Sequence, residues 1–158
     1  MAEGAAGQRD PDPIELLQGS QAFFPALVAA IDGARAEVRL ETYIFDFNGE
    51  AASVAAALQR AGARGVATWV VVDGVGTEAL PPAWRQRFQA AGVQWSVFAP
   101  LGTMGLLLPS QWRRLHRKLC VIDGRVAFCG GINILDDFHD PHHGRLAQPR
   151  LDFAVRAS

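Results

Sequence analysis

The sequence predicts one α/β domain, a sandwich of helices and a sheet. The chain has 158 residues, enough for a single hydrophobic core but not for two. Its hydrophobic content of 49% and formal charge of −1 are those of an ordinary globular protein. Helical and strand patterns alternate over residues 20–98, which indicates that at least part of the sheet is parallel.

Each alternating element is identified by the spacing of its apolar residues. Ser20 is predicted to cap a helix with one apolar face, formed by Phe23, Phe24, Leu27, Val28 and Ile31. The elements that follow are a strand over residues 37–45, a helix over 49–63, a strand over 66–72, a helix over 81–91 and a strand over 93–98. Because the strand over 66–72 is apolar almost throughout, we expect both of its faces to be covered.

The start of the chain gives expectations about organisation and location. Residues 1–13 are rich in Gly, Ala, Pro and acidic side chains, which predicts a disordered segment before a domain over 14–158. This start lacks the basic and then apolar layout of a signal peptide. The longest apolar run, residues 22–31, is shorter than the ~20 residues that span a bilayer, so any membrane contact is expected to be peripheral.

Residues 99–109 interrupt the alternation with an apolar segment rich in Gly and Pro, which Trp112 and two arginines follow. One interpretation is a buried loop over the sheet edge. The other is a lipid-facing lip, because apolar residues flanked by Trp and Arg settle at membrane interfaces. Beyond this segment we expect a short helix start over 134–138, a polar loop over 140–148 and a last strand over 151–156.

A tight hairpin is predicted from two apolar strands, residues 118–122 and 126–129. Asp123-Gly124 joins them, and this pair favours a type I′ turn. Turn chemistry alone explains Asp123, so a structural or supporting role is favoured for its carboxylate.

One end of this hairpin carries the groups that a phosphate needs. The neutral imidazole of His116 is a competent nucleophile towards a phosphodiester. Lys118, two residues on and therefore on the same face, supplies positive charge for the nonbridging oxygens, and Asn133 supplies an amide donor. Gly130 and Gly131 leave room for close approach. Capping of the following helix is the structural alternative for Asn133.

Charge is unevenly distributed along the chain. Residues 101–158 hold eight basic and five acidic side chains, whereas residues 1–50 hold three basic and nine acidic ones. Because the whole chain carries almost no net charge, its overall charge does not attract it to nucleic acid or to an anionic membrane.

The two cysteines are expected to be free. Cys120 and Cys129 fall within the hairpin strands among apolar neighbours, which favours buried free thiols over a disulfide.

A second cluster of acids and histidines superficially resembles a metal site. Its members are Asp136, Asp137, His139, Asp140, His142 and His143. They lack the ordered spacing that pre-forms a ligand set, which favours a solvated loop over metal binding.

The spacing of the hairpin residues resembles the HKD motif of the phospholipase D superfamily. It reads His-x-Lys, four residues, Asp, six residues, Gly-Gly-x-Asn, over residues 116–133. The surrounding segments, residues 41–45, 64–66, 72–74 and 152–156, extend the likeness to the amino-terminal half of bacterial cardiolipin synthases that lack transmembrane helices. The resemblance covers roughly residues 14–157.

The resemblance implies a phospholipase D-like α-β-α sandwich with a mixed central sheet and a single HKD half, working without a metal or other cofactor. In the family, an acid on the last strand orients the histidine, and this acid corresponds here to Asp152. The structural alternative is that Asp152 is an acid at a strand end without a catalytic role. The implied catalytic residues are His116, Lys118, Asp123, Asn133 and Asp152. The implied phosphate-binding residues are His116, Lys118, Gly130, Gly131 and Asn133.

The implied reaction passes a phosphatidyl group through a phosphohistidine to the hydroxyl of phosphatidylglycerol, at the cytoplasmic face of the membrane. Family members need two facing histidines, one as nucleophile and one as general acid. No other histidine here has a lysine two places on, so the second half must come from an identical subunit or from a carboxy-terminal half.

Two other functions fit the sequence. One is a homodimeric, metal-independent nuclease of the same superfamily. The sequence lacks the broad stripe of basic residues that binding to a phosphate backbone uses, which argues against this function. The other is a catalytically silent half-domain that only associates with a partner or a membrane.

Overall fold

A computed structural model of the chain describes residues 14–77, 79–100, 113–140 and 144–158. Its helices are α1 (Gly19–Gly33), α2 (Ala51–Ala63) and α3 (Pro82–Ala91). Its strands are β1 (Ile14–Gln18), β2 (Glu37–Thr42), β3 (Ala67–Asp73), β4 (Gln94–Phe98), β5 (Leu119–Ile122), β6 (Val126–Gly130), β7 (His139–Asp140), β8 (Gly144–Arg145) and β9 (Phe153–Ala157).

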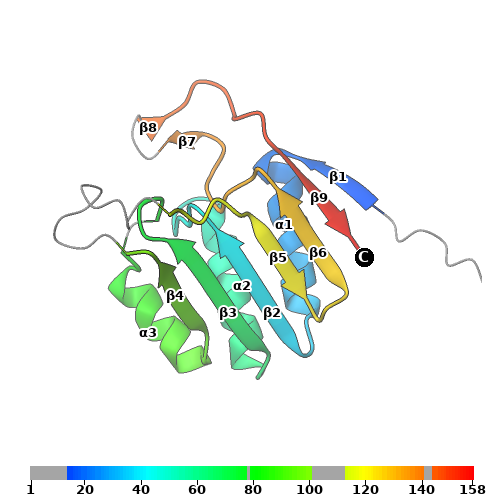
Figure 1. Cartoon of the computed structure of the whole chain (residues 1–158), viewed down its shortest axis with the longest axis vertical. Coiled ribbons are helices and arrows are strands. Elements are labelled where there is room, and N and C mark those ends of the chain that lie inside the picture. The colour runs from blue at the N-terminus through cyan, green and yellow to red at the C-terminus, as the bar shows by residue number, and fades with distance from the viewer. Residues whose placement is uncertain (1–13, 78, 101–112, 141–143) are drawn as a thin grey trace, which may run out of the picture.

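Among the described residues, seven strands form one mixed sheet in the order β1-β9-β6-β5-β2-β3-β4 (Figure 1). β2, β3 and β4 are parallel, with α2 and α3 as their crossovers, as the alternating pattern predicted. β5, β6, β9 and β1 each run antiparallel to their neighbours. The mixed α/β fold is therefore confirmed. β7 and β8 form a separate small hairpin.

The hydrophobic core lies between the sheet and its helices. Leu27 and Ile31 of α1 and Leu58 of α2 are fully buried against Val38 and Val70 of the central strands. Burial of each such side chain contributes about 1.5–3 kcal/mol. α2 packs between α1 and α3, so these helices form one layer behind the sheet (Figure 1).

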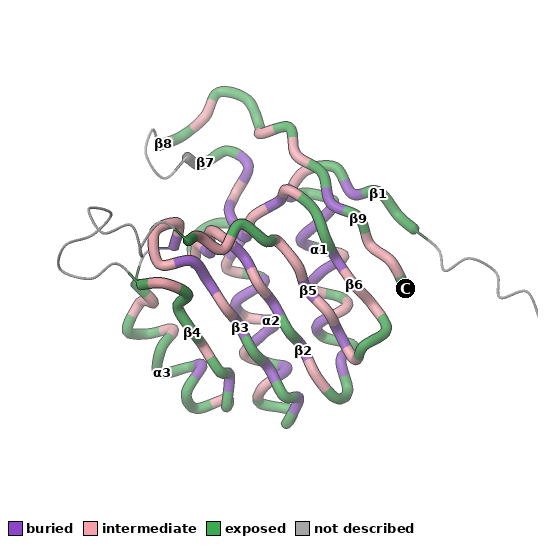
Figure 2. The backbone as a smooth tube through the Cα atoms, in the orientation of Figure 1, coloured by how far each residue is buried: buried purple, intermediate pink, exposed green. Residues whose placement is uncertain are grey.

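The opposite face of the sheet is open in the described part of the chain, and buried residues alternate with more exposed ones along β2, β3 and β5 (Figure 2). On β3, Val70 is buried whereas Trp69 is 37% exposed. The expectation that this strand is covered on both faces is therefore wrong for the described residues, which contribute helices to one face only. The expectation is based on the apolar composition of this strand. Composition does not identify the element that would cover each face.

β1 is a strand that the sequence pattern did not predict. It pairs antiparallel with β9, and only Leu17 faces the core, while Ile14 and Leu16 are 75% and 67% exposed. A five-residue edge strand with one buried side chain has too weak a period-2 signal to be recognised in isolation.

The helix expected over residues 134–138 is absent. Ile134 forms an isolated bridge with Phe45, and the residues after it turn. The carboxylate of Asp136 accepts a hydrogen bond from the backbone N–H of Phe138 at 2.8 Å, which is a local alternative to helical bonding.

The cap expected for α1 is also different. The N-cap position is Gln18, which makes no side-chain cap bond, and Ser20 lies inside the helix. The backbone N–H of Ser20 instead donates to the carboxylate of Asp137 at 2.6 Å. A buried acid 117 residues away in sequence thus satisfies the helix end.

The two thiols lie on opposite faces of the β5–β6 hairpin, because Cys120 is opposite Phe128 and Cys129 is opposite Leu119. Both are free. Cys120 is buried as expected, and burial raises the pKa of its thiol to about 12. Cys129 is exposed on the open face, so the expectation that it is buried is wrong.

The expectations for residues 1–13, for most of the segment 99–109, and for His142 and His143 lie outside the described residues. Within the described ranges, no helix has the length and apolar character needed to cross a membrane.

Candidate active site

Four segments that are far apart in sequence meet at the upper edge of the sheet in Figure 1. Glu41 of β2 is opposite Leu119 of β5, so the chain before β5 lies beside the chain after β2. At the same edge, the backbone N–H of Gly130 donates to the carbonyl of Lys118 at 3.2 Å. β9 begins there too, because Ala154 is opposite Gly130.

Tyr43, directly after β2, forms the centre of this edge. The imidazole of His116 stacks on its ring, with centroids 4.6 Å apart and planes inclined by 26°. The ammonium of Lys118 lies 5.6 Å from the same ring centroid and donates to the carbonyl of His116 at 3.1 Å. The structure therefore brings His116 and Lys118 together around an aromatic platform. Sequence reasoning did not assign Tyr43 to the site.

Asn133 is held by the segment that carries Tyr43. Its side-chain Oδ1 accepts a hydrogen bond from the backbone N–H of Ile44 at 3.0 Å and lies 3.4 Å from the hydroxyl of Thr42. Among the described residues no hydrogen bond takes up its NH₂ group, which leaves that group as a donor. The alternative that Asn133 caps a helix is wrong, because no helix follows it.

Gly130 and Gly131 allow β9 to approach the hairpin closely. A Cβ on Gly130 would overlap the carbonyl of Phe153 and the backbone of Ala154, and a Cβ on Gly131 would overlap the carboxylate of Asp152. The two glycines therefore have a packing role, besides any role in admitting a ligand.

Asp152 lies at the same edge of the sheet. Its Oδ1 accepts a hydrogen bond from the backbone N–H of Phe153 at 2.8 Å, and its carbonyl accepts one from Gly19 at 2.9 Å. No hydrogen bond joins it to His116 within the described ranges. The structure places Asp152 near the site without bringing it into contact with the histidine.

Asp123 lies at the other end of β5, away from His116. It occupies a left-handed turn position with φ 52°, and Gly124 follows with φ 62°, as the predicted type I′ turn requires. Its carboxylate accepts hydrogen bonds of 2.8–2.9 Å from the backbone N–H groups of Arg35, Ala36 and Glu37. These bonds lower the pKa of Asp123. The carboxylate ties the hairpin turn to the α1–β2 loop.

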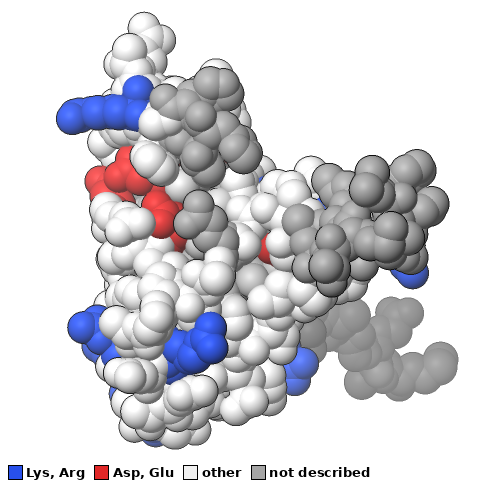
Figure 3. Space-filling view, turned by 90° about the vertical axis from the view of Figure 1, so that its left-hand side faces the viewer, with Lys and Arg blue, Asp and Glu red and all other residues white. Residues whose placement is uncertain are grey.

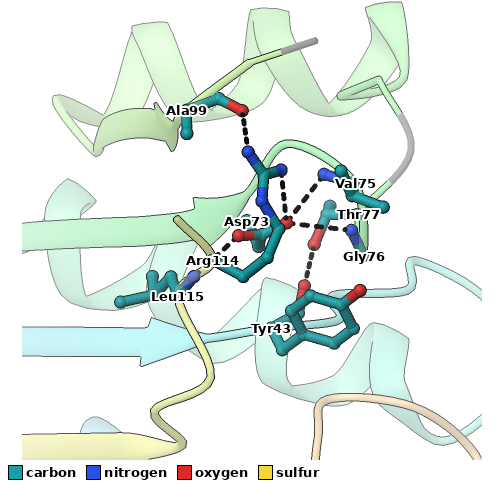
Figure 4. Close-up of polar contacts among 8 residues, drawn as sticks. All are labelled: Tyr43, Asp73, Val75, Gly76, Thr77, Ala99, Arg114 and Leu115. Atoms are coloured by element: carbon teal, nitrogen blue, oxygen red, sulfur yellow. Dashed lines mark hydrogen bonds and ion pairs between the residues drawn. The ribbon is translucent and has the colours of Figure 1, made fainter. Parts of the chain in front are cut away.

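A second feature that sequence reasoning missed is the buried ion pair of Asp73 and Arg114 (Figure 4). Asp73 ends β3 and is fully buried, and the guanidinium of Arg114 approaches its Oδ1 to 3.3 Å. Arg114 belongs to the segment that leads into His116. The available signal was an acid at the end of an otherwise apolar strand, where burial of a carboxylate requires partners.

An open cleft of about 470 Å³ adjoins His116 on the open side of the sheet. Val71, Phe98 and Leu115 give it apolar walls. The exposed side chains of Arg113 and Arg117 add positive charge, with Arg117 3.5 Å from Glu41. The lining thus combines apolar surface with charged side chains beside His116.

Two acids of the predicted loop cluster accept hydrogen bonds from backbone N–H groups. Asp137 is buried and bonded to α1, Asp136 holds a turn, and the side chain of His139 is exposed. The described residues contain no group of three or more potential ligands arranged around a metal position.

The chain is similar to known protein sequences over most of its length. The family model described as "Cardiolipin synthase, PLD-like domain" matches residues 27–139. The chain is 37% identical over 150 residues to cardiolipin synthase B of Salmonella typhi, and 34% identical over 148 residues to cardiolipin synthase B of Escherichia coli K12. These matches cover 95% and 94% of this chain but only 36% and 35% of those proteins. The chain thus spans about a third of the length of these relatives.

Solved structures share the fold. The phospholipase D family member Nuc from Salmonella typhimurium matches with a TM-score of 0.62 and 18% identity, over 94% of this chain and 83% of its own. NucT from Helicobacter pylori matches with a TM-score of 0.62 and 14% identity, over 91% and 84%. At these identities the likeness concerns the fold alone.

Proposed function

The chain belongs to the PLD-like domain family of cardiolipin synthases, and from this premise we propose that it carries one half-site for phosphatidyl transfer between phospholipids. The observation that carries the proposal is the convergence of His116 and Lys118 on Tyr43 at one sheet edge. A nucleophile and a cation held by one platform can act on the same phosphodiester.

In the proposed reaction the imidazole of His116 attacks the phosphorus of phosphatidylglycerol. A P–N bond forms and the P–O bond to the glycerol headgroup breaks, so the phosphatidyl group is carried as a phosphohistidine. The departing glycerol oxygen takes a proton from a general acid, which we assign to the histidine of a second half-site.

In the second step the hydroxyl of another phosphatidylglycerol attacks the phosphohistidine. Its proton passes to the same opposing histidine, the new P–O bond forms, and the P–N bond breaks to restore His116. The products are cardiolipin and glycerol. The chain carries one HKD motif, so the proposed opposing histidine belongs to a second copy or to a carboxy-terminal half.

Lys118 and the NH₂ group of Asn133 are the proposed donors to the nonbridging oxygens, where negative charge grows in the transition state. Asp152 is proposed to orient His116 when substrate is bound. Its Oδ1 accepts the bond from Phe153, and its Oδ2 is the proposed acceptor for the imidazole N–H.

The cleft beside His116 favours a lipid as substrate. The apolar walls match the glycerol backbone of an anionic phospholipid, and Arg113 supplies positive charge for its phosphate, whereas Arg117 is paired with Glu41 of the same cleft. A nucleic acid would need a broad basic surface. The face on the α3 side carries small, separate groups of basic and acidic side chains (Figure 3).

The proposal is tested with the purified chain, phosphatidylglycerol vesicles and EDTA. Its mass in solution is measured first, and then cardiolipin and glycerol are quantified. We expect lipid turnover in an associated form of the chain and its loss in His116→Ala. Cleavage of single-stranded DNA under the same conditions without lipid turnover would support the nuclease instead, and wild-type turnover by His116→Ala would refute the mechanism.

A further inference from the structure

We propose that Asp73 is a positioning residue for His116, because its buried carboxylate fixes both the segment that carries the histidine and the loop that supports Tyr43. The expected effect on turnover rests on the proposed function; the expected effect on the geometry of His116 does not.

The first link runs from Asp73 to the residue before the histidine. The Oδ2 atom of Asp73 accepts a hydrogen bond from the backbone N–H of Leu115 at 2.7 Å (Figure 4). Residues 113–117 belong to no helix or strand, so no ladder of backbone hydrogen bonds sets their path. A charge-assisted bond one residue before His116 therefore limits where the imidazole can lie.

The second link runs from Asp73 to Tyr43. The Oδ1 atom accepts hydrogen bonds from the backbone N–H groups of Val75 and Gly76, at 2.8 and 3.2 Å. A Cβ on Gly76 would overlap the Tyr43 ring, and the hydroxyl of Thr77 donates to the Tyr43 carbonyl at 2.9 Å. The turn that Asp73 organises is thus the surface against which Tyr43 packs.

Arg114 connects Asp73 to Ala99. Its guanidinium contacts Asp73 at 3.3 Å and donates to the carbonyl of Ala99 at 3.2 Å, and the side chain is only 13% exposed. Ala99 has a φ of 43°, a conformation that costs energy in a residue other than glycine. The same guanidinium therefore joins the end of β4 to the segment that carries His116.

Both sides of the Tyr43–His116 stack consequently depend on one carboxylate. Asparagine at this position would keep the shape but replace one acceptor oxygen by an NH₂ group. In the described part of the chain, both oxygens accept hydrogen bonds from N–H donors, so this NH₂ group would face a donor in either rotamer. Asp73→Asn is therefore expected to loosen the stack.

The test is the NMR spectrum of the His116 imidazole in the full chain, assigned by its loss in His116→Ala. In the wild type, the Tyr43 ring current should displace the carbon-bound proton signals from those of free histidine. In Asp73→Asn these signals should move towards the free values. Asp46→Asn is the matched control, because Asp46 also holds a turn through backbone N–H groups, and in the described residues its carboxylate is hydrogen-bonded only to Phe47 and Asn48.

In the active form of the protein, Asp73→Asn should lower kcat by about 10- to 100-fold with little change in KM, because the histidine is misplaced while substrate contacts remain. Asp46→Asn should leave kcat near wild type. If Asp73→Asn does not fold, Arg114→Lys replaces it, since lysine cannot span Asp73 and Ala99 together and should shift the His116 signals in the same direction.

A folded Asp73→Asn or Arg114→Lys protein with unchanged His116 signals would overturn the inference. So would an Asp46→Asn protein whose His116 signals move equally. Failure of the proposed function has a different signature: turnover that survives His116→Ala would refute the nucleophile while leaving the spectroscopic result on Asp73 valid.

Discussion

The imidazole of His116 lies stacked on the ring of Tyr43, with centroids 4.6 Å apart. Tyr43 follows β2 and His116 precedes β5, and the antiparallel pairing of these strands brings the two rings together. An aromatic stack of this kind contributes about 0.5–1.5 kcal/mol beyond simple burial. It holds one face of the proposed nucleophile and leaves its edge accessible.

We predict that Tyr43→Leu lowers kcat by roughly 3- to 10-fold, the factor that corresponds to loss of the stack. Tyr43→Phe keeps the ring and should retain most of the activity. Steady-state assays of lipid turnover in both variants measure this. Equal losses in the two variants would assign the effect to the phenolic hydroxyl and contradict a role for the stack.

Asp123 is predicted to stabilise the fold in a pH-dependent way. Backbone N–H bonds lower its pKa from the ordinary 3.8 in the folded state. Its stabilising effect is therefore fully present well above pH 3.8 and is lost as the pH falls through the folded-state pKa. Asp123→Asn should lower the free energy of unfolding by about 1 kcal/mol at pH 7, which is less than the roughly 1.5–3 kcal/mol of hydrogen bonds to charged groups because the site is partly solvated.

Urea unfolding at pH 7 and at pH 3 measures this effect, and the difference between wild type and Asp123→Asn should shrink in acid. Arg125→Gln is the control, since charge attraction from Arg125 is the weakest cause of the pKa shift. A larger loss for Arg125→Gln than for Asp123→Asn would contradict the account.

The two cysteines should differ in reactivity. Cys129 is exposed, whereas burial raises the pKa of Cys120 to about 12, so almost none of it is thiolate at pH 8. A thiol reagent should label one site rapidly in the native protein. Cys129→Ser should abolish this labelling and Cys120→Ser should preserve it. Rapid labelling of both thiols would show that β5 is not buried as described.

Glycines 130 and 131 should differ in their tolerance of alanine. A Cβ at Gly130 meets backbone atoms of β9, which cannot move without disturbing the sheet, so Gly130→Ala should destabilise the protein by about 1–3 kcal/mol. At Gly131 the obstacle is the carboxylate of Asp152. Asp152→Ala should therefore relieve much of the cost of Gly131→Ala and none of that of Gly130→Ala. Denaturant unfolding of the single and double variants tests this.

Local patterns predicted the elements that local forces determine. The β5–β6 hairpin, its type I′ turn at Asp123 and the parallel β2–β3–β4 unit follow from turn chemistry and hydrophobic period. The motif also contains His116 and Lys118, which the structure brings together at one edge of the sheet.

What sequence reasoning missed depends on contacts between distant residues. The cap of α1 comes from Asp137, β1 exists because β9 is there to pair with it, and the segment after Asn133 is held by a bridge to Phe45. Tyr43 and Asp73 were missed for the same reason. Each sits at a strand end without a motif of its own, and only the topology places it beside His116.

The most direct test of the central claim is to quench the active protein during turnover of phosphatidylglycerol labelled at phosphorus, and to map the covalently bound label. The account predicts an acid-labile, base-stable phosphoryl linkage on the peptide that contains His116, and its absence in His116→Ala. Label on another residue, or turnover of labelled lipid by His116→Ala at the wild-type rate, would contradict it.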